Sequence, residues 1–240
     1  MFAAISKSRG RLGVLTALGL VTCAVNALTI SPVIVELSPA RRVVSITVTN
    51  PSESALNFQA EALAWSQPDG HDRYEDTTDL MVVPPIAEIA PGASQIFRVT
   101  TRTPPSQREQ AYRLILEDVT DETAALPDSA TVNIRVRHSL PVFVAASGQP
   151  RASAQLGPCA APAGKGCVRL DNDGERYLMV KALTIEGGAW RKEIPLGTRV
   201  LAGARREWRF DLPAHIAAPL QVRVETSAGA FVGEIPLSLR

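Results

Sequence analysis

Short apolar segments separated by proline and glycine turns recur along this chain, and the stretch Met81–Val99 shows the pattern most clearly. It reads MVVPPIAEIAPGASQIFRV, which is an apolar segment of strand length, a double proline, a Pro-Gly turn and a second strand. Further strands are expected at Gln110–Val119 and at Thr131–Val144, where apolar and polar residues alternate for most of the length. The pattern predicts an all-β fold with many turns.

The first 27 residues have the features of an export signal: a basic start, an apolar run at Leu12–Val21 and small residues ending at Ala27. Cys23 leaves a lipoprotein signal open as an alternative, although threonine is a poor residue before such a cysteine. Without this segment, 213 of the 240 residues remain, enough for two β domains of about 100 residues each. The formal net charge of +1 predicts no general attraction to nucleic acid or to an acidic membrane.

Seven strands separated by turns are expected in the first domain, which is typical of an immunoglobulin-like sandwich. Pro32 makes the first of them an edge strand, and the polar segment Gln67–Asp79 is expected to be a loop. The small, polar residues Ala145–Pro150 mark the boundary, so residues 28–147 form the first domain and residues 148–240 a second, smaller β domain. The seven strand ranges are Leu28–Leu37, Val43–Thr49, Leu56–Trp65, two within Leu80–Val99, Gln110–Val119 and Thr131–Val144.

Cys159 and Cys167 flank a loop rich in proline and glycine in the predicted mature chain. In an oxidising compartment this spacing predicts a disulfide. A metal site would need further Cys or His ligands, and none lie near in the sequence, so neither a metal nor a cofactor is expected.

Few residues suggest catalysis. The histidines His71, His138 and His215 have no metal-binding spacing, and no nucleophile-elbow motif is present. Asp171–Glu175 imitates the start of a calcium loop but lacks its later ligands, so a tight Asp-Gly turn is the better interpretation. We therefore expect a protein that is not an enzyme.

The order of these features resembles the first domain of the PapD-like periplasmic pilus chaperones, nearest to their archaic branch of the Csu and spore-coat U type. Val83-Pro84-Pro85 matches the family's threonine-proline-proline element, where a cis bond before Pro84 is expected. The resemblance covers Leu28 to about Leu239 and is weaker in the second domain. It implies a periplasmic protein with two immunoglobulin-like β-sandwich domains set at an angle and a cleft between them.

In these chaperones the last strand of the first domain is donated to a pilus subunit that lacks its own final strand. The corresponding apolar row here is Val132, Ile134 and Val136, although the pattern alone equally allows this row to face the domain's own core. The resemblance implies pilus subunits and an outer-membrane usher as partners, and no nucleic acid or small-molecule substrate.

Family members also hold the C-terminal carboxylate of the subunit with basic residues in the cleft. The two classical basic positions are empty here, because one falls in Ser31–Ile34 and the other on Pro141. We expect Arg113 to replace them, with Arg137 and His138 as second choices. A solvated strand residue is the alternative interpretation of Arg113.

Two further residues match the family. Arg98 and Glu109 correspond to a charged pair that braces the first domain against the second, so a structural role is implied for both.

Two other classes of protein compete with a chaperone. An exported two-domain adhesin or structural subunit would need a spare donor segment at its start, whereas LTISPVIVEL leads directly into a strand. A secreted carbohydrate-binding or hydrolytic sandwich would concentrate aromatic residues or paired carboxylates in its loops, and only 5% of the residues are aromatic.

Overall fold

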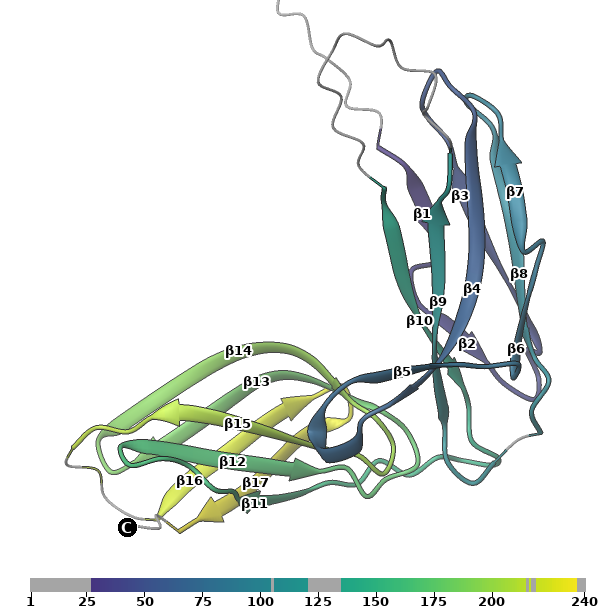
Figure 1. The fold of residues 1–240 in the computed structure, drawn as a ribbon. Coiled ribbons are helices and arrows are strands. Elements are labelled where there is room, and N and C mark those ends of the chain that lie inside the picture. Colours follow the sequence, from purple (N-terminus) through teal and green to yellow (C-terminus); the bar gives the residue numbers. More distant parts are fainter. Residues whose placement is uncertain (1–26, 105, 121–134, 215, 217–218, 237–240) are drawn as a thin grey trace, which may run out of the picture.

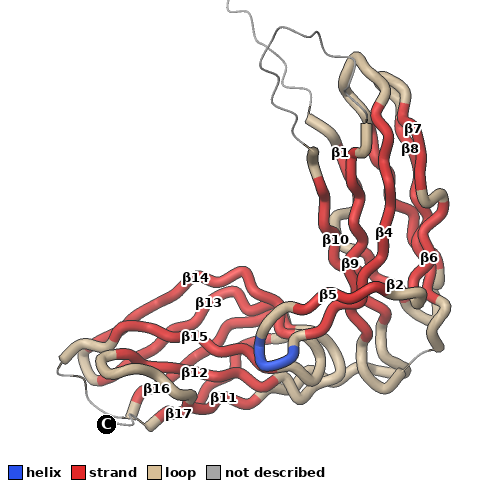
Figure 2. The backbone as a smooth tube through the Cα atoms, in the orientation of Figure 1, coloured by secondary structure: helices blue, strands red, loops and turns tan. Residues whose placement is uncertain are grey.

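The computed structural model describes residues 27–104, 106–120, 135–214, 216 and 219–236. These residues form two β-sandwiches that meet at an angle (Figure 1). The helical content of the described residues is a single 3-10 turn, η1 (Pro68–Gly70), which Figure 2 shows beside the second sandwich. No helix in the described part of the chain is long and apolar enough to cross a membrane. The predicted all-β fold class is confirmed.

The first sandwich consists of two sheets, with strand orders β1-β3-β8-β6 and β2-β10-β9-β4-β5, and β7 also pairs with β4. Alternate side chains fill the space between the sheets, including Ile46, Phe58, Phe97, Leu114 and Val142. Its strands are β1 (Thr29–Ser31), β2 (Val35–Leu37), β3 (Val43–Thr49), β4 (Leu56–Ser66), β5 (Arg73–Asp76), β6 (Leu80–Val83), β7 (Ile86–Ile89), β8 (Ser94–Thr101), β9 (Gln110–Asp118) and β10 (Arg137–Val144).

The segment Leu28–Leu37, predicted as one strand, is divided between the two sheets. β1 pairs antiparallel with β3, whereas β2 pairs parallel with β10. Pro32 lies between them and has no N–H to donate, so the ladder is interrupted where the chain crosses. Because β1 and β2 are edge strands joined by this short crossing, both sheets have an edge on the same side of the sandwich.

The segment Gln67–Asp79 is not a simple loop, because it contains η1 and the strand β5, which pairs with the end of β4. The sequence RYED gave no strand signal, since all four of its residues are exposed and do not alternate. The peptide bond between Val83 and Pro84 is cis, as predicted.

The second sandwich has the sheets β11-β12-β15 and β14-β13-β16-β17. Cys159 and Cys167 form the predicted disulfide, with their Cα atoms 5.1 Å apart. Asn172 is buried, and its amide donates to the carbonyls of Val200 and Leu201. The strands are β11 (Gln155–Pro158), β12 (Lys165–Asp171), β13 (Leu178–Gly187), β14 (Trp190–Val200), β15 (Arg205–Asp211), β16 (Leu220–Thr226) and β17 (Gly229–Ile235).

The expected division of the chain after residue 147 falls between β10 and β11, and we propose it as the domain boundary. The export signal predicted for residues 1–27 lies outside the described residues except for Ala27.

Candidate functional site

One edge of β10 is only partly covered. β9 pairs with its whole length on one side, but β2 covers the other side only at Val142–Val144. Among the residues that the structure describes, no strand lies beside Arg137–Pro141. Such an uncovered edge can accept a strand from another protein.

The side chains on one face of β10 continue the core of the first sandwich past the covered part. Leu140 and Val142 are buried in that core, His138 follows them on the same face by alternation, and Val136 beyond it is 45% exposed. The carbonyl of Val136 accepts a hydrogen bond from the N–H of Asp118 at 3.1 Å, so the pairing of β10 with β9 continues to this residue. An apolar residue therefore stands at the surface in line with the core.

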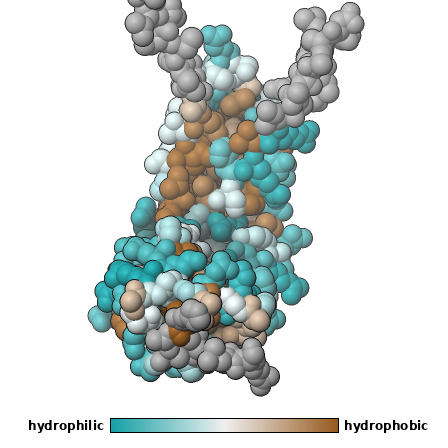
Figure 3. Space-filling model, turned by 90° about the vertical axis from the view of Figure 1, so that its left-hand side faces the viewer, coloured by the Kyte–Doolittle hydropathy of each residue, from teal (hydrophilic) through white to brown (hydrophobic). Residues whose placement is uncertain are grey.

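We call the edge of β1 (Thr29–Ser31) together with residues 136–141 the open seam, because both edges belong to the same side of the sandwich and no described strand closes it. Figure 3 shows apolar surface along the first sandwich in the view from this side. Of the predicted donor residues, Val136 lies in the open seam, while Val132 and Ile134 lie outside the described residues.

The other face of the sheet β2-β10-β9-β4-β5 meets the second sandwich. Trp65 and Phe143 are buried on this face and pack with Leu201 of the second sandwich. The ring of Phe143 stacks on that of Tyr177, with centroids 4.1 Å apart. This apolar contact forms the inner corner of the angle between the sandwiches.

Arg113 lies next to this corner. Its side chain lies on the same face of the sheet as Trp65 and Phe143, two residues along β9 from Ala111, which is opposite Phe143. The guanidinium carbon lies 4.0 Å from the centroid of the Trp65 ring and 5.7 Å from that of Tyr74. Aromatic faces attract a guanidinium without occupying its N–H donors.

In the described part of the chain Arg113 forms no ion pair, and its Nε is buried without a hydrogen-bond partner. A buried donor without a partner costs free energy. Sequence analysis identified the arginine but missed Trp65 and Tyr74, because the register that brings them together is not visible in the sequence.

Arg137 and His138, the second choices for binding the subunit's carboxylate, are placed differently from Arg113. Arg137 shares the face of Arg113, but its guanidinium lies 3.0 Å from the Glu61 carboxylate and 3.8 Å from that of Glu117. His138 points to the opposite face, with Leu140. Of the three predicted residues, Arg113 is therefore the one that lies against Trp65 and has no ion pair with a described residue.

Glu109 and Arg98 do not form a pair. The Glu109 carboxylate accepts a hydrogen bond from the N–H of Tyr177 at 2.9 Å, and its own N–H donates to the carbonyl of Glu175. Arg98 is exposed on β8 in the other sheet, between Ser45 and Val83. The contact between domains therefore involves Glu109, and the expected participation of Arg98 is corrected.

Burial makes the Glu109 carboxyl a weaker acid than usual. Desolvation raises its pKa from 4.5 to about 7, the Tyr177 N–H and the charge of Arg176 oppose the rise, and Glu36 adds to it. A carboxyl whose pKa rises on folding contributes stability that is full below its ordinary pKa and is lost as the pH rises through the folded value. The loss amounts to about 3 kcal/mol.

We therefore expect the free energy of unfolding to fall between about pH 5 and about pH 8. Glu109→Gln should flatten this slope and stabilise the protein at the higher pH, because its amide oxygen still accepts from Tyr177. Urea unfolding across this pH range measures the effect. A variant with the wild-type slope would show that other groups cause it.

Comparison with known proteins agrees with this geometry. Residues 27–149 match the family described as pili and flagellar-assembly chaperone, PapD N-terminal domain. No curated protein matches the chain. Similar solved structures include the CsuC–CsuE chaperone and tip-subunit pre-assembly complex from the archaic chaperone-usher Csu pili of Acinetobacter baumannii, at 20% identity and a TM-score of 0.62 over 87% of this chain and 98% of that one.

A second similar structure is the Salmonella enterica SafA pilin in complex with the SafB chaperone, at 14% identity and a TM-score of 0.59 over 88% of this chain and 98% of that one. The class 5 fimbriae chaperone CfaA has 15% identity and a TM-score of 0.61 over 88% of this chain and 100% of that one. These likenesses confirm the two-sandwich fold, and the matched family is one of chaperones rather than enzymes. The chain belongs to the PapD-like family of chaperones for pilus and flagellar assembly.

Proposed function

We propose that this protein is a periplasmic chaperone that folds and caps pilus subunits by lending them the uncovered edge of β10, and then delivers them to an outer-membrane usher. The open seam carries the proposal, because there the core row of β10 continues to the exposed Val136 beside a strand edge without a partner among the described residues. A subunit that lacks one strand needs both backbone pairing and apolar side chains at alternate positions. The open seam offers both.

Arg113 is proposed to hold the C-terminal carboxylate of the subunit. Its planar group can donate to both carboxylate oxygens, and Trp65 and Tyr74 hold it on the sheet face next to the second sandwich. The absence of basic residues at the two classical positions supports membership of the archaic branch, in which another cleft residue would take this role. The family match favours this function over that of an exported adhesin.

The function is tested by isolating the tagged protein from a periplasmic extract and identifying what accompanies it by mass spectrometry. The expected companion is one small β-rich subunit at a one-to-one ratio, which aggregates when it is produced alone. Recovery of the protein without such a subunit, from cells that assemble the fibre, would contradict the proposal.

A further inference from the structure

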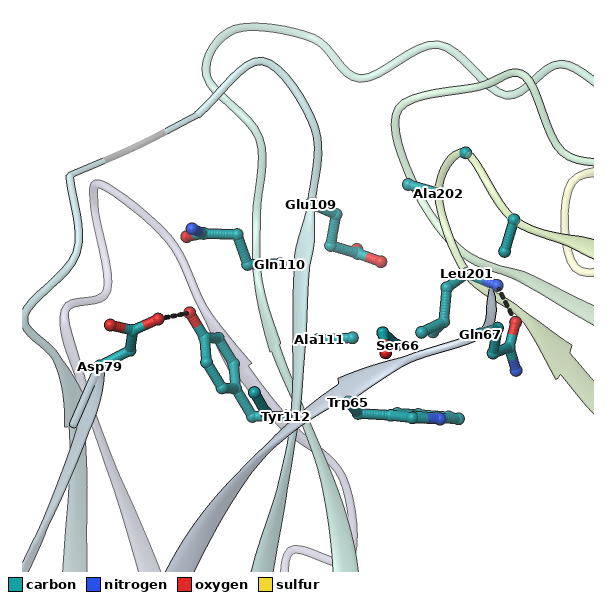
Figure 4. Close-up of a pocket in the computed structure, with 13 residues that line it drawn as sticks. Trp65, Ser66, Gln67, Asp79, Glu109, Gln110, Ala111, Tyr112, Leu201 and Ala202 are labelled. Carbon is teal, nitrogen blue, oxygen red and sulfur yellow. Dashed lines mark hydrogen bonds between the residues drawn. The ribbon is translucent and has the colours of Figure 1, made fainter. Parts of the chain in front are cut away.

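A buried glutamine of the first sandwich hydrogen-bonds to the backbone of the second. Gln67 follows β4 and is 7% exposed. Its Oε1 accepts from the N–H of Leu201 at 2.9 Å, and its Nε2 donates to the carbonyl of Arg199 at 2.9 Å. Figure 4 shows the amide directed at Leu201 across the gap between the chain segments. This side chain therefore links the sheet that carries Arg113 to the second sandwich.

The same amide also holds a carboxylate. Gln67 Nε2 lies 2.7 Å from Asp72 Oδ1, which in addition accepts the indole N–H of Trp65 at 3.0 Å. Arg206 of the second sandwich lies 3.6 Å from the other carboxylate oxygen of Asp72. A Trp side chain has two rotatable bonds and one N–H, so the bond to Asp72 fixes the plane of the ring.

The ring held in this way carries Arg113. Since the Arg113 guanidinium lies 4.0 Å from the Trp65 ring centroid, an unbroken series of contacts leads from the backbone of the second sandwich to this cation. A free arginine side chain loses rotamer entropy when it binds a ligand, and prior ordering removes that cost. The arrangement therefore prepares Arg113 before an anion arrives.

We propose that Gln67 and Asp72 are positioning residues, which couple the second sandwich to the anion-binding arginine by fixing the Trp65 ring. The consequence for subunit binding rests on the proposed function, whereas the ordering of Arg113 does not. The competing view is that Gln67 and Asp72 only join the two sandwiches. The two views differ in what they predict for the Arg113 side chain.

The first test needs no subunit. Nuclear magnetic resonance of the protein follows the Trp65 indole N–H, assigned with Trp65→Phe, and the exchange of the Arg113 Nε–H with water. Gln67→Ala and Asp72→Ala should shift the indole signal and speed the Arg113 exchange at least tenfold. Asp72→Asn should stay close to the wild type, because its amide oxygen accepts both N–H donors.

Trp65→Phe separates the two views, since it removes the N–H bond to Asp72 and leaves the bonds of Gln67 to Leu201 and Arg199 in place. It should speed the Arg113 exchange when measured at a temperature at which the variant is fully folded, although the smaller buried ring also lowers the unfolding midpoint. Gln221→Ala, an exposed glutamine of the second sandwich, is the control and should change neither signal. Unchanged Arg113 exchange in Gln67→Ala, Asp72→Ala and Trp65→Phe would overturn the proposal.

The second test uses the co-purified subunit, unfolded in guanidinium chloride and diluted into each variant. Gln67→Ala should weaken its capture about tenfold in the wild-type background and should add little to Arg113→Ala. Equal losses in both backgrounds would mean that Gln67 acts without Arg113, and would overturn the proposal. Should Arg113→Ala capture the subunit normally, the anchoring function fails, and the exchange measurement alone decides on the positioning role.

Discussion

Arg113→Ala should raise the dissociation constant for the client subunit by about a hundredfold to several thousandfold while the melting temperature of the chaperone hardly changes. The removal of one partner from a desolvated ion pair costs about 3–5 kcal/mol, because the other charge is left without compensation. The wild-type guanidinium forms no ion pair with a described residue, so its loss breaks no such bond in the free protein. Isothermal titration and thermal unfolding of the same preparations measure the two quantities.

Two comparisons make this result specific. Arg113→Lys should recover only part of the affinity, because an ammonium group cannot donate to both carboxylate oxygens in one plane. Amidation of the subunit's C terminus should weaken wild-type binding by a similar factor and add little to the alanine variant. Arg98→Ala, an exposed strand arginine in the other sheet, should bind normally.

Additive losses from Arg113→Ala and amidation would show that the arginine and the carboxylate do not meet. Arg137→Ala then becomes the informative variant, because Arg137 lies on the same sheet face. In the free protein its guanidinium lies within ion-pair distance of Glu61 and Glu117, and it would have to leave these carboxylates to bind another. We therefore expect a small effect from Arg137→Ala.

Alternation along single strands could be predicted well from the sequence. The predicted range Val43–Thr49 coincides with the observed bounds of β3. In β9 and β16 the buried positions are those of the apolar residues. A period of two residues is a local property, so it depends little on the rest of the fold. The proposed donor row rests on this alternation, as does the placement of Arg137 on the other face of the strand.

Pairing between distant segments could not be predicted in the same way. β5 has no alternation of its own and is a strand only because it lies against the end of β4. That pairing places Tyr74 opposite Trp65, while the pairing of β4 with β9 brings Trp65 next to the row of Arg113. The aromatic support of Arg113 thus depends on two registers, and a shift of one residue in either would turn the side chains to opposite faces.

The positioning role of Gln67 was missed for a related reason. A polar residue in a polar segment gives no signal of burial, yet its amide satisfies backbone groups of a sheet more than a hundred residues away in the sequence. The glycine at position 70 is a weak sign in the sequence that the chain here is held close to another segment. In the structure its φ of +80° suits glycine, and a Cβ there would lie 3.3 Å from the carbonyl of Arg205. Sequence analysis therefore proposed Arg113 but not the side chains that lie against it.

The second large effect is expected from Val136→Asp, which should weaken capture of the subunit at least a hundredfold. Val136 is 45% exposed in the free protein and lies in line with the core residues Leu140 and Val142. When a subunit covers the open seam, an aspartate here would place an unpaired carboxylate in an apolar groove, at a cost of about 3 kcal/mol or more. The loss of the valine's own burial, about 1.5–3 kcal/mol when complete, acts in the same direction.

Folding of the free chaperone should survive this substitution, because the new carboxylate can remain in water until a subunit binds. Val232→Asp is the matched control, since Val232 is 64% exposed on β17 of the second sandwich, far along the chain from the open seam, and this variant should bind normally. Circular dichroism and thermal unfolding establish that both variants are folded before their capture of the subunit is compared. If Val136→Asp unfolds the chaperone while Val232→Asp does not, Val136 belongs to the chaperone's own core, and the donated surface must lie elsewhere on β10.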